Sequence, residues 1–351
     1  MLDYVRAYLR PDGRAPLIGD ADGGRVMPLV VSHEADDHAY VLAVGAAFFN
    51  DPRYKVADAV PEELTWLLGG PAVESYEKLR RGDAATSASF AHAGACVMRE
   101  GDLYLLFNVS GAGLNGRGSH GHNDALSIEV SACGHSFIAD AGTHLYTADL
   151  RARQLFRSTA YHSTVEVDGE EQNTTDKRTP FVIGDEARPR LLRWSAGPER
   201  DVAVAEHVGY ERLRQPVTHR RAVVFDKRER YWLIEDELRG AAAEHVFRFR
   251  FHAAPEVEAR VRDDSIVELH RKATEARLLI VALDVRERAV LEPAWSSRDY
   301  GDKRASQVAC WTLRARPPLA VAWALVPVRA DEDEARSLEL IARLPKRREQ
   351  N

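Results

Sequence analysis

The sequence predicts a mainly β protein: a large antiparallel β-sandwich preceded by a few helices. Three observations support this fold class. The spacing of apolar residues changes near residue 86 from a helical period to alternation. After that point many short apolar runs follow one another with almost no helical pattern between them. Short polar turns separate several neighbouring runs, as in β-hairpins, and this arrangement is typical of antiparallel sandwiches.

Residues 1–85 have the pattern of helices. Val5 and Leu9 fall at helical spacing before a proline-containing turn, and residues 39–49 form an alanine-rich apolar run. Pro61 and the two glutamates after it are typical of the first turn of a helix. These helices look too few and too short to enclose a core of their own. We therefore expect them to be the end of a larger helical domain.

Residues 86–345 have the pattern of strands. The clearest strand-like runs are residues 103–107, 126–130, 223–225, 231–234, 246–251, 309–313 and 319–325. The polar turn between the third and fourth of these runs predicts a hairpin. The last six residues, 346–351, are mostly charged, and we expect them to form a frayed tail.

The composition excludes several classes of protein. The chain has 48 basic and 54 acidic residues, a net charge of −6, which argues against a nucleic-acid partner. It does not argue against an acidic polysaccharide, because a local basic cleft can lie in an acidic protein. The three cysteines are scattered and show no CxxC spacing. The residues after Met1 lack the basic and apolar regions typical of a signal peptide, and no apolar run approaches the roughly 20 residues of a membrane span.

One segment departs from ordinary sandwich sequence. A glycine-rich stretch leads into His120 and His122, and alternate residues of an extended segment project from the same face. If residues 132–134 form a three-residue turn, Asp140 returns on the face that carries His122. His162 begins a later strand and is a candidate third ligand. Two histidines and an aspartate suit zinc.

Two other interpretations of these residues stay open on spacing alone. Histidines beside glycines often only cap loops, and an Asp-Ala-Gly segment is commonly a turn. The HxH pair followed by Glu129 also suggests a cupin-like metal enzyme. However, this glutamate lies seven positions after His122 and would alternate to the opposite face of the strand.

Three ordered motifs resemble those of heparinase II/III-like polysaccharide lyases. Residues 118–127 read GSHGHNDALS and resemble the family segment GHGHxDALS. Residues 140–146 read DAGTHLY and resemble DPGTYxY. Residues 156–169 read FRSTAYHSTVEVDG and resemble FRSTxAHNTVxVDG. The order and spacing of the motifs match, and the similarity covers residues 15–175 well.

The resemblance implies a fold and a ligand set. The family fold is an incomplete α/α toroid followed by an antiparallel β-sandwich, so residues 1–85 would be the end of the toroid. The second histidine of HxH, the aspartate and the later histidine would bind a structural zinc, here His122, Asp140 and His162. The first histidine, His120, would face the sugar and take part in catalysis. Family members are typically periplasmic or in the cell envelope.

The implied reaction is β-elimination on a polysaccharide that contains uronic acid. A base removes the C5 proton, an acid protonates the C4 oxygen, and the substrate carboxylate must be neutralised. A histidine, with an ordinary pKa of about 6.5, can serve as the base. Arg157 could contact a substrate carboxylate and Tyr146 could line the substrate site.

Part of the family site is expected outside this chain. In the family the acid, a tyrosine, and the Asn or His that neutralises the carboxylate lie in the toroid, well before HxH. Only 119 residues precede His120 here. We therefore expect an upstream toroid or a partner chain to supply these groups, and little activity from this chain alone. A non-catalytic, zinc-stabilised carbohydrate-binding or structural sandwich is the alternative. The segment 19–25 resembles a family loop, which we expect to be only a capped turn.

Overall fold

The computed structural model describes residues 1–351 except 24–28, 31–33, 114–117, 177 and 345–351. The predicted tail, residues 346–351, therefore lies outside the described residues. Within the described part of the chain, no helix has the length and apolar character needed to span a bilayer. The described structure is mostly antiparallel β-sheet, which confirms the predicted fold class.

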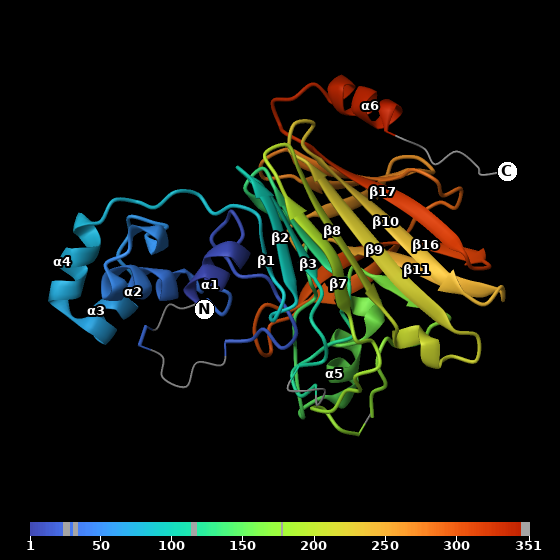
Figure 1. Ribbon diagram of the computed structural model, residues 1–351, viewed down its shortest axis with the longest axis horizontal. Coiled ribbons are helices and arrows are strands. Elements are labelled where there is room, and N and C mark those ends of the chain that lie inside the picture. The colour runs from blue at the N-terminus through green and yellow to red at the C-terminus, as the bar shows by residue number, and fades with distance from the viewer. Residues whose placement is uncertain (24–28, 31–33, 114–117, 177, 345–351) are drawn as a thin grey trace.

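The N-terminal helices lie together at one side of the sheets (Figure 1). They are α1 (Leu2–Tyr8), α2 (Ala39–Phe49), a short 3-10 helix (Pro52–Tyr54), α3 (Glu62–Leu68) and α4 (Gly70–Lys78). Buried apolar side chains, including Leu42, Leu64 and Tyr76, form a small hydrophobic cluster among them. The expectation that these helices enclose no core is therefore wrong. Their assignment to a toroid stays a prediction.

The strands in the described part of the chain form three antiparallel sheets. The five-stranded sheet contains β1 (Ala88–Phe90), β2 (Ala95–Glu100), β3 (Leu103–Asn108), β4 (Ile128–Ala132) and β5 (His135–Ile138) in that order. The eight-stranded sheet has the order β12 (Glu258–Val261), β13 (Ile266–Arg271), β14 (Ala276–Ala282), β17 (Leu319–Val328), β10 (Tyr231–Gly240), β9 (Val217–Asp226), β8 (Arg200–His207) and β7 (Arg190–Ala196). The four-stranded sheet has the order β15 (Val290–Ser296), β16 (Arg304–Ala315), β11 (His245–His252) and β6 (Val165–Val167).

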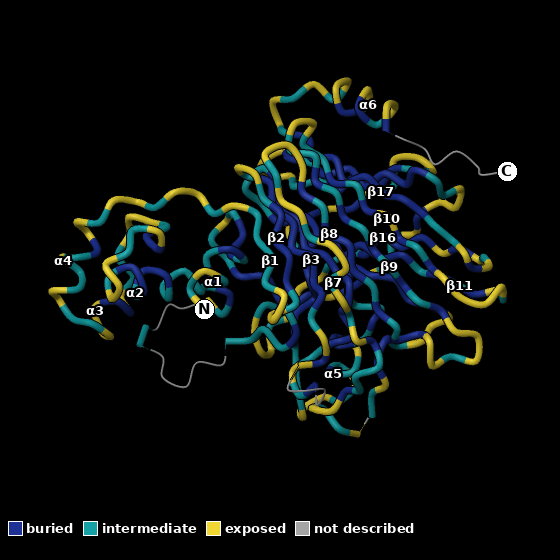
Figure 2. The backbone as a smooth tube through the Cα atoms, in the orientation of Figure 1, coloured by how far each residue is buried: buried dark blue, intermediate teal, exposed yellow. Residues whose placement is uncertain are grey.

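One hydrophobic core joins the three sheets. Buried side chains from all of them pack together, among them Phe107, Phe249 and Trp232. Strands such as β9 alternate between buried and partly exposed residues, as expected for a sheet with one face on a core. The two smaller sheets meet at the bridge between Ile138 and Ala253. Figure 2 shows that buried residues dominate the strands, whereas exposed residues gather on the loops and outer helices.

The turn between β4 and β5 differs from the sequence prediction. It contains two residues, Cys133 and Gly134, rather than three, because Ala132 pairs directly with His135. Both turn residues have positive φ, 52° and 75°, as a two-residue type I′ turn requires. A bulge after Val130 then shifts the pairing by one residue. The assumed register was therefore wrong.

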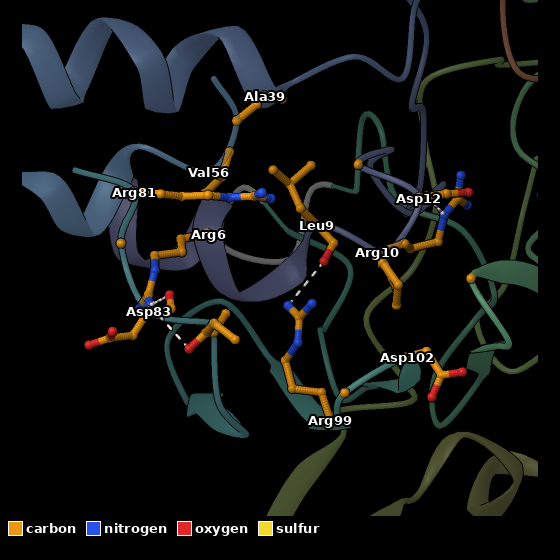
Figure 3. A pocket seen from close by; sticks show the side chains of 18 residues that line it. Arg6, Leu9, Arg10, Asp12, Ala39, Val56, Arg81, Asp83, Arg99 and Asp102 are labelled. Atoms are coloured by element: carbon orange, nitrogen blue, oxygen red, sulfur yellow. Dashed lines mark hydrogen bonds and ion pairs between the residues drawn. The ribbon is translucent and has the colours of Figure 1, made fainter. Parts of the chain in front are cut away.

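The helices pack on the outer face of the five-stranded sheet. Arg99 on β2 donates through Nη1 to the carbonyl oxygens of Ala7 and Leu9, at 3.0 and 3.1 Å. A cavity of about 700 Å³ lies beside this contact, lined by residues of both parts (Figure 3). Arg6, which also lines it, donates to the carbonyl oxygen of Asp83. This cavity holds none of the candidate site residues, and its Arg6 and Arg99 bind main-chain carbonyl oxygens.

Candidate metal centre and active site

Three buried side chains form the metal-ligand group that the sequence predicts. His122 lies in the loop between β3 and β4, Asp140 follows β5, and His162 follows the short 3-10 helix Thr159–Tyr161. Each offers one ligand atom, and these atoms all lie within 4.8 Å of one another. The three residues are thus brought together where the two smaller sheets meet. That they bind zinc stays a prediction.

His122 is held in one tautomer by a carboxylate. Its Nε2 lies 2.9 Å from Oδ1 of Asp20, so Nε2 carries the proton and donates it. Its Nδ1 is buried and has no hydrogen-bond partner among the described residues. Burial lowers the pKa of His122, which favours the neutral imidazole that a metal requires.

His162 and Asp140 form a buried pair. His162 Nδ1 lies 2.6 Å from Oδ2 of Asp140. Burial alone would lower the pKa of His162, but the charge of Asp140 outweighs it and the pKa is raised. Burial would likewise raise the pKa of Asp140, but His162 holds it below its ordinary value. The second ring nitrogen of His162, Nε2, is buried and has no partner among the described residues.

These donors fit a metal ion. Buried nitrogen atoms without partners are uncommon in folded proteins because losing water without replacing its hydrogen bond costs free energy. Here two such imidazole nitrogens, on His122 and His162, lie beside the carboxylate of Asp140. Nitrogen and oxygen donors of this kind suit zinc. A bound metal would satisfy the atoms that the protein leaves unpaired.

Two further acids surround the ligand group. Asp124 is buried, and its pKa is raised to about 7, chiefly by that burial. Burial likewise raises the pKa of Glu129 to about 7. The carboxylate of Glu129 accepts hydrogen bonds from the main-chain N–H groups of Leu17 and Asp140, at 2.8 and 3.4 Å. Glu129 thus supports the Asp140 backbone and is not in the ligand group, unlike the glutamate of the cupin-like alternative.

His120 lies beside the ligand group but is open to solvent. Its side chain is 65% exposed, whereas that of His122 is fully buried. The two rings nevertheless contact one carboxylate, because His120 Nδ1 lies 3.0 Å from Oδ2 of Asp20. A carboxylate partner on Nδ1 leaves Nε2 as the unprotonated nitrogen of the neutral ring. His120 is therefore exposed to solvent beside the ligand group, and its role as a base stays a prediction.

Asp20 is a residue of the candidate site that sequence reasoning missed. It was expected to belong to a capped turn, but its carboxylate joins His120 to His122. Arg153 donates to both carboxylate oxygens, and Thr143 donates to Oδ1 at 2.9 Å. Burial would raise the pKa of Asp20, but the hydrogen bonds and charges of His122 and Arg153 hold it well below its ordinary value.

The Asp20 loop docks directly on the HxH segment. Asp20 N–H donates to the carbonyl oxygen of His120 at 3.0 Å. Gly19 has a φ of +59°, and a Cβ there would lie 2.6 Å from the same oxygen. Only glycine fits this backbone at such a close approach. The glycine before Asp20 was therefore a usable signal in the sequence.

The two predicted substrate-binding residues differ in their surroundings. Arg157 is fully buried, and burial lowers its pKa to about 10. It donates to the carbonyl oxygens of Thr179, Pro180 and Val182, at 3.0 to 3.1 Å. These contacts leave it a structural role in holding residues 179–182 and do not favour direct contact with a substrate.

Tyr146 lies partly exposed near His120. Its hydroxyl donates to Oδ2 of Asp22 at 2.5 Å, and its ring lies 5.1 Å from the Arg153 guanidinium. Burial, with the hydrogen bond to Asp22, raises the pKa of Tyr146 well above its ordinary value. The ring is therefore firmly placed, and its contact with substrate stays a prediction.

Comparison with known proteins supports the resemblance. Residues 82–335 match the heparinase II/III-like C-terminal family. The fold is similar to that of heparan sulfate lyase HepC from Pedobacter heparinus, with a TM-score of 0.68 at 17% identity over 93% of this chain and 46% of that one. A structure of heparinase III gives a TM-score of 0.68 at 16% identity over 95% and 48%. A search of curated proteins found no match.

The chain spans a little under half the length of these solved structures. Identities of this size establish the fold alone. The family match, however, covers well over half of the present chain and contains all three motifs. The chain therefore belongs to the heparinase II/III-like C-terminal family.

Proposed function

We propose that this chain is the sandwich part of a polysaccharide lyase that cleaves uronic-acid-containing glycans by β-elimination. The observation that carries the proposal is the position of His120. It is exposed, its Nδ1 is bonded to Asp20, and it adjoins a buried group that fits a metal. Solved structures with a similar fold include a heparan sulfate lyase and heparinase III, which supports this reaction class.

In the proposed reaction His120 removes the C5 proton of the uronate through Nε2. The resulting imidazolium is stabilised by the carboxylate of Asp20, as a buried carboxylate stabilises the catalytic histidine of other enzymes. Arg153 holds that carboxylate in place. The electron pair of the C5–H bond forms the C4–C5 double bond, and the C4–O bond to the leaving sugar breaks. An acid must protonate the departing oxygen.

The metal has a structural role in this proposal. His122, Asp140 and His162 would hold zinc, which would fix the loop that presents His120. The groups that neutralise the substrate carboxylate and protonate the leaving oxygen would come from an upstream helical toroid or a partner chain. The proposed partner is an acidic polysaccharide.

The test is the ultraviolet absorbance of the unsaturated uronate product. Heparan sulfate, chondroitin sulfate and alginate are each incubated with the 351-residue chain and with a longer chain that includes coding sequence upstream of Met1. Little or no product is expected from the shorter chain, because catalytic groups that act together lose most of their effect when one is missing. Product is expected from the longer chain.

The matched variants are His120→Ala and His92→Ala in the longer chain. His92 is an exposed histidine in the turn before β2, so its loss should leave the rate unchanged. His120→Ala should lower the rate by about 10²–10⁴-fold, the usual contribution of a general base. A longer chain that binds the glycans but forms no unsaturated product would favour a non-catalytic, zinc-stabilised carbohydrate-binding sandwich instead.

A further inference from the structure

Four aromatic rings form a row that begins at His120. The Phe181 ring centroid lies 5.8 Å from that of His120 and 5.4 Å from that of Tyr146. The Tyr300 centroid lies 5.5 Å from that of Tyr146. The four residues come from four separate segments of the chain, so the tertiary fold assembles the row. We call the three rings beyond His120, those of Phe181, Tyr146 and Tyr300, the aromatic row.

The aromatic row is exposed where large rings are usually covered. Phe181 is 37% exposed and Tyr300 is 48% exposed, and Tyr146 is partly exposed. Leaving ring surface in water forgoes the free energy of its burial, about 25 cal/mol per Å². Contiguous exposed apolar surface commonly marks a binding site. The end of the row at His120 places this surface at the proposed active site.

The Phe181 end of the row rests on buried cations. Arg153 Nε donates to the carbonyl oxygen of Pro180 at 2.8 Å, and Arg157 Nη1 donates to that of Val182 at 3.0 Å. Both residues that flank Phe181 are therefore tied to side chains that are fully buried. The Arg153 guanidinium also lies 5.8 Å from the Phe181 ring centroid and 5.1 Å from that of Tyr146.

The Tyr300 end is also fixed by hydrogen bonds. Gly301 N–H donates to the carbonyl oxygen of His144 at 2.9 Å, and Ser297 Oγ donates to that of Thr143 at 2.9 Å. These bonds join the loop after β15 to the segment that carries Tyr146. The row is thus held from both ends by the same elements that hold Asp20 and the ligand group.

We propose that the aromatic row is a stacking subsite for the pyranose rings of the polysaccharide, continuing from His120. This proposal rests on the proposed function. Pyranose rings present apolar C–H faces that pack on aromatic rings, while their hydroxyl and carboxylate groups stay in water. Rigid aromatic side chains lose little conformational entropy in such contacts. Because the row ends at the residue that removes the C5 proton, a chain stacked on it extends out of the reaction centre.

The experiment measures retardation of the 351-residue chain in native gels that contain heparan sulfate, chondroitin sulfate or alginate. Phe181→Ala and Tyr300→Ala are compared with Trp66→Ala, an exposed aromatic of α3 outside the row that is 67% exposed. Each row variant should weaken binding by about 2- to 10-fold, the range of one aromatic contact. Tyr300→Trp should restore most of the affinity lost in Tyr300→Ala, and the Trp66 variant should bind like the wild type.

Melting temperatures show whether the variants stay folded. The proposal is overturned if the row variants bind as the Trp66 variant does, or if the wild type binds none of the three polysaccharides. The lyase assay separates it from the proposed function. If the longer chain carrying Phe181→Ala or Tyr300→Ala forms product with an unchanged KM, the subsite proposal is wrong and the lyase proposal stands. If the row variants weaken polysaccharide binding but the longer chain forms no product, the lyase proposal is wrong and the subsite proposal stands.

Discussion

Two of the buried histidine–carboxylate clusters among the described residues differ in a way that distinguishes a candidate site from a structural network. The first is the ligand group, His122, Asp140 and His162. The second, which we call the inner network, comprises His207, His219, Arg221, Asp236 and Trp323 on the eight-stranded sheet. Both are fully or almost fully buried, and both pair imidazole with carboxylate at 2.6 to 2.7 Å.

The inner network satisfies its own polar atoms. Asp236 accepts from His219 and Arg221, both at 2.7 Å, and from Trp323 at 3.1 Å. His207 Nδ1 accepts from Gly209 N–H at 3.2 Å, which leaves its Nε2 proton to face His219 Nδ1 at 3.3 Å. No side-chain atom of this network lacks a partner. The ligand group, by contrast, leaves a nitrogen unpaired on each histidine.

The ligand group differs from the inner network because its buried imidazole nitrogens lack partners and converge beside a carboxylate. The two clusters are also linked. Arg221 Nη1 donates to the carbonyl oxygens of Leu126 and Ser163, both at 2.8 Å. Ser163 directly follows His162, and Leu126 follows the HxH segment with a φ of +60°. The inner network therefore anchors the two segments that carry the ligand group.

The largest expected effect comes from breaking the inner network. Asp236→Asn should destabilise the protein by about 3–5 kcal/mol, because Arg221 would be left buried without its counter-charge. Thermal unfolding followed by circular dichroism measures the change. Glu199→Gln is the control, since Glu199 pairs with Arg228 in an ion pair whose side chains are 68% and 73% exposed. Equal melting temperatures for the two variants would show that the network contributes little.

For the ligand group we expect the zinc content and the stability of the protein to change together. Protein purified without chelator should contain about one zinc per chain, and His122→Ala should lose it. At a zinc concentration 100 times Kd, bound metal stabilises the fold by about 2.7 kcal/mol. A chelator should therefore lower the melting temperature of the wild type but not of His122→Ala. Metal analysis by mass spectrometry gives the stoichiometry.

His207→Gln sharpens this second test because His207 is equally buried but belongs to the inner network. It should keep its full zinc content. Zinc loss from both histidine variants would mean that the metal follows general stability and not the ligand group. Absence of stoichiometric zinc from the wild type would contradict the metal assignment itself.

Replacing Asp20 should have a smaller effect on metal affinity. Asp20→Asn removes the charge that orients His122, and loss of such a partner typically weakens metal binding by about 10–100-fold. Competition with a chromophoric zinc indicator measures the affinity. The exposed carboxylate of Asp176, which pairs with Arg178, provides the control variant Asp176→Asn. If Asp20→Asn binds zinc as tightly as the wild type, Asp20 does not support the metal ligands and acts only on His120.

The sheet architecture could be predicted because alternation is a local signal. The runs at 223–225 and 231–234 lie in β9 and β10, which pair as the predicted hairpin. The register between β4 and β5 could not be predicted, because it depends on a turn length and a bulge that change every facing residue. Sequence spacing also did not reveal that the small helices would share a cluster of apolar side chains.

The ligand group was found through motifs, whereas its supporting residues were not. Asp20 lies 100 positions before His120, and no local pattern links them. Arg157 lies within a motif, but its burial beneath residues 179–182 became visible only in the fold. Phe181 and Tyr300 carry no motif at all. Phe181 lies beside His120 and Tyr300 beside Tyr146 because separate loops meet in space, which the sequence spacing does not reveal.

The smallest expected effect is a difference in pH dependence between the clusters. Burial lowers the pKa of His207 well below its ordinary value, and burial also lowers that of His219 despite Asp236. As the pH falls below about 6.5, the unfolded chain takes up protons that these buried rings do not, so the free energy of unfolding falls.

His207→Gln removes one such group. Its stability should therefore decline less steeply than that of the wild type, by up to about 1.4 kcal/mol per pH unit below pH 6.5. Urea unfolding at pH 7.5, 6.0 and 5.0 measures both slopes, and contributions from histidines that do not contact His207 cancel in the comparison. If the free energy of unfolding varies with pH in the same way in both proteins, His207 takes up a proton in the folded state. The inner network would then not keep His207 as the neutral imidazole that its hydrogen bonds require.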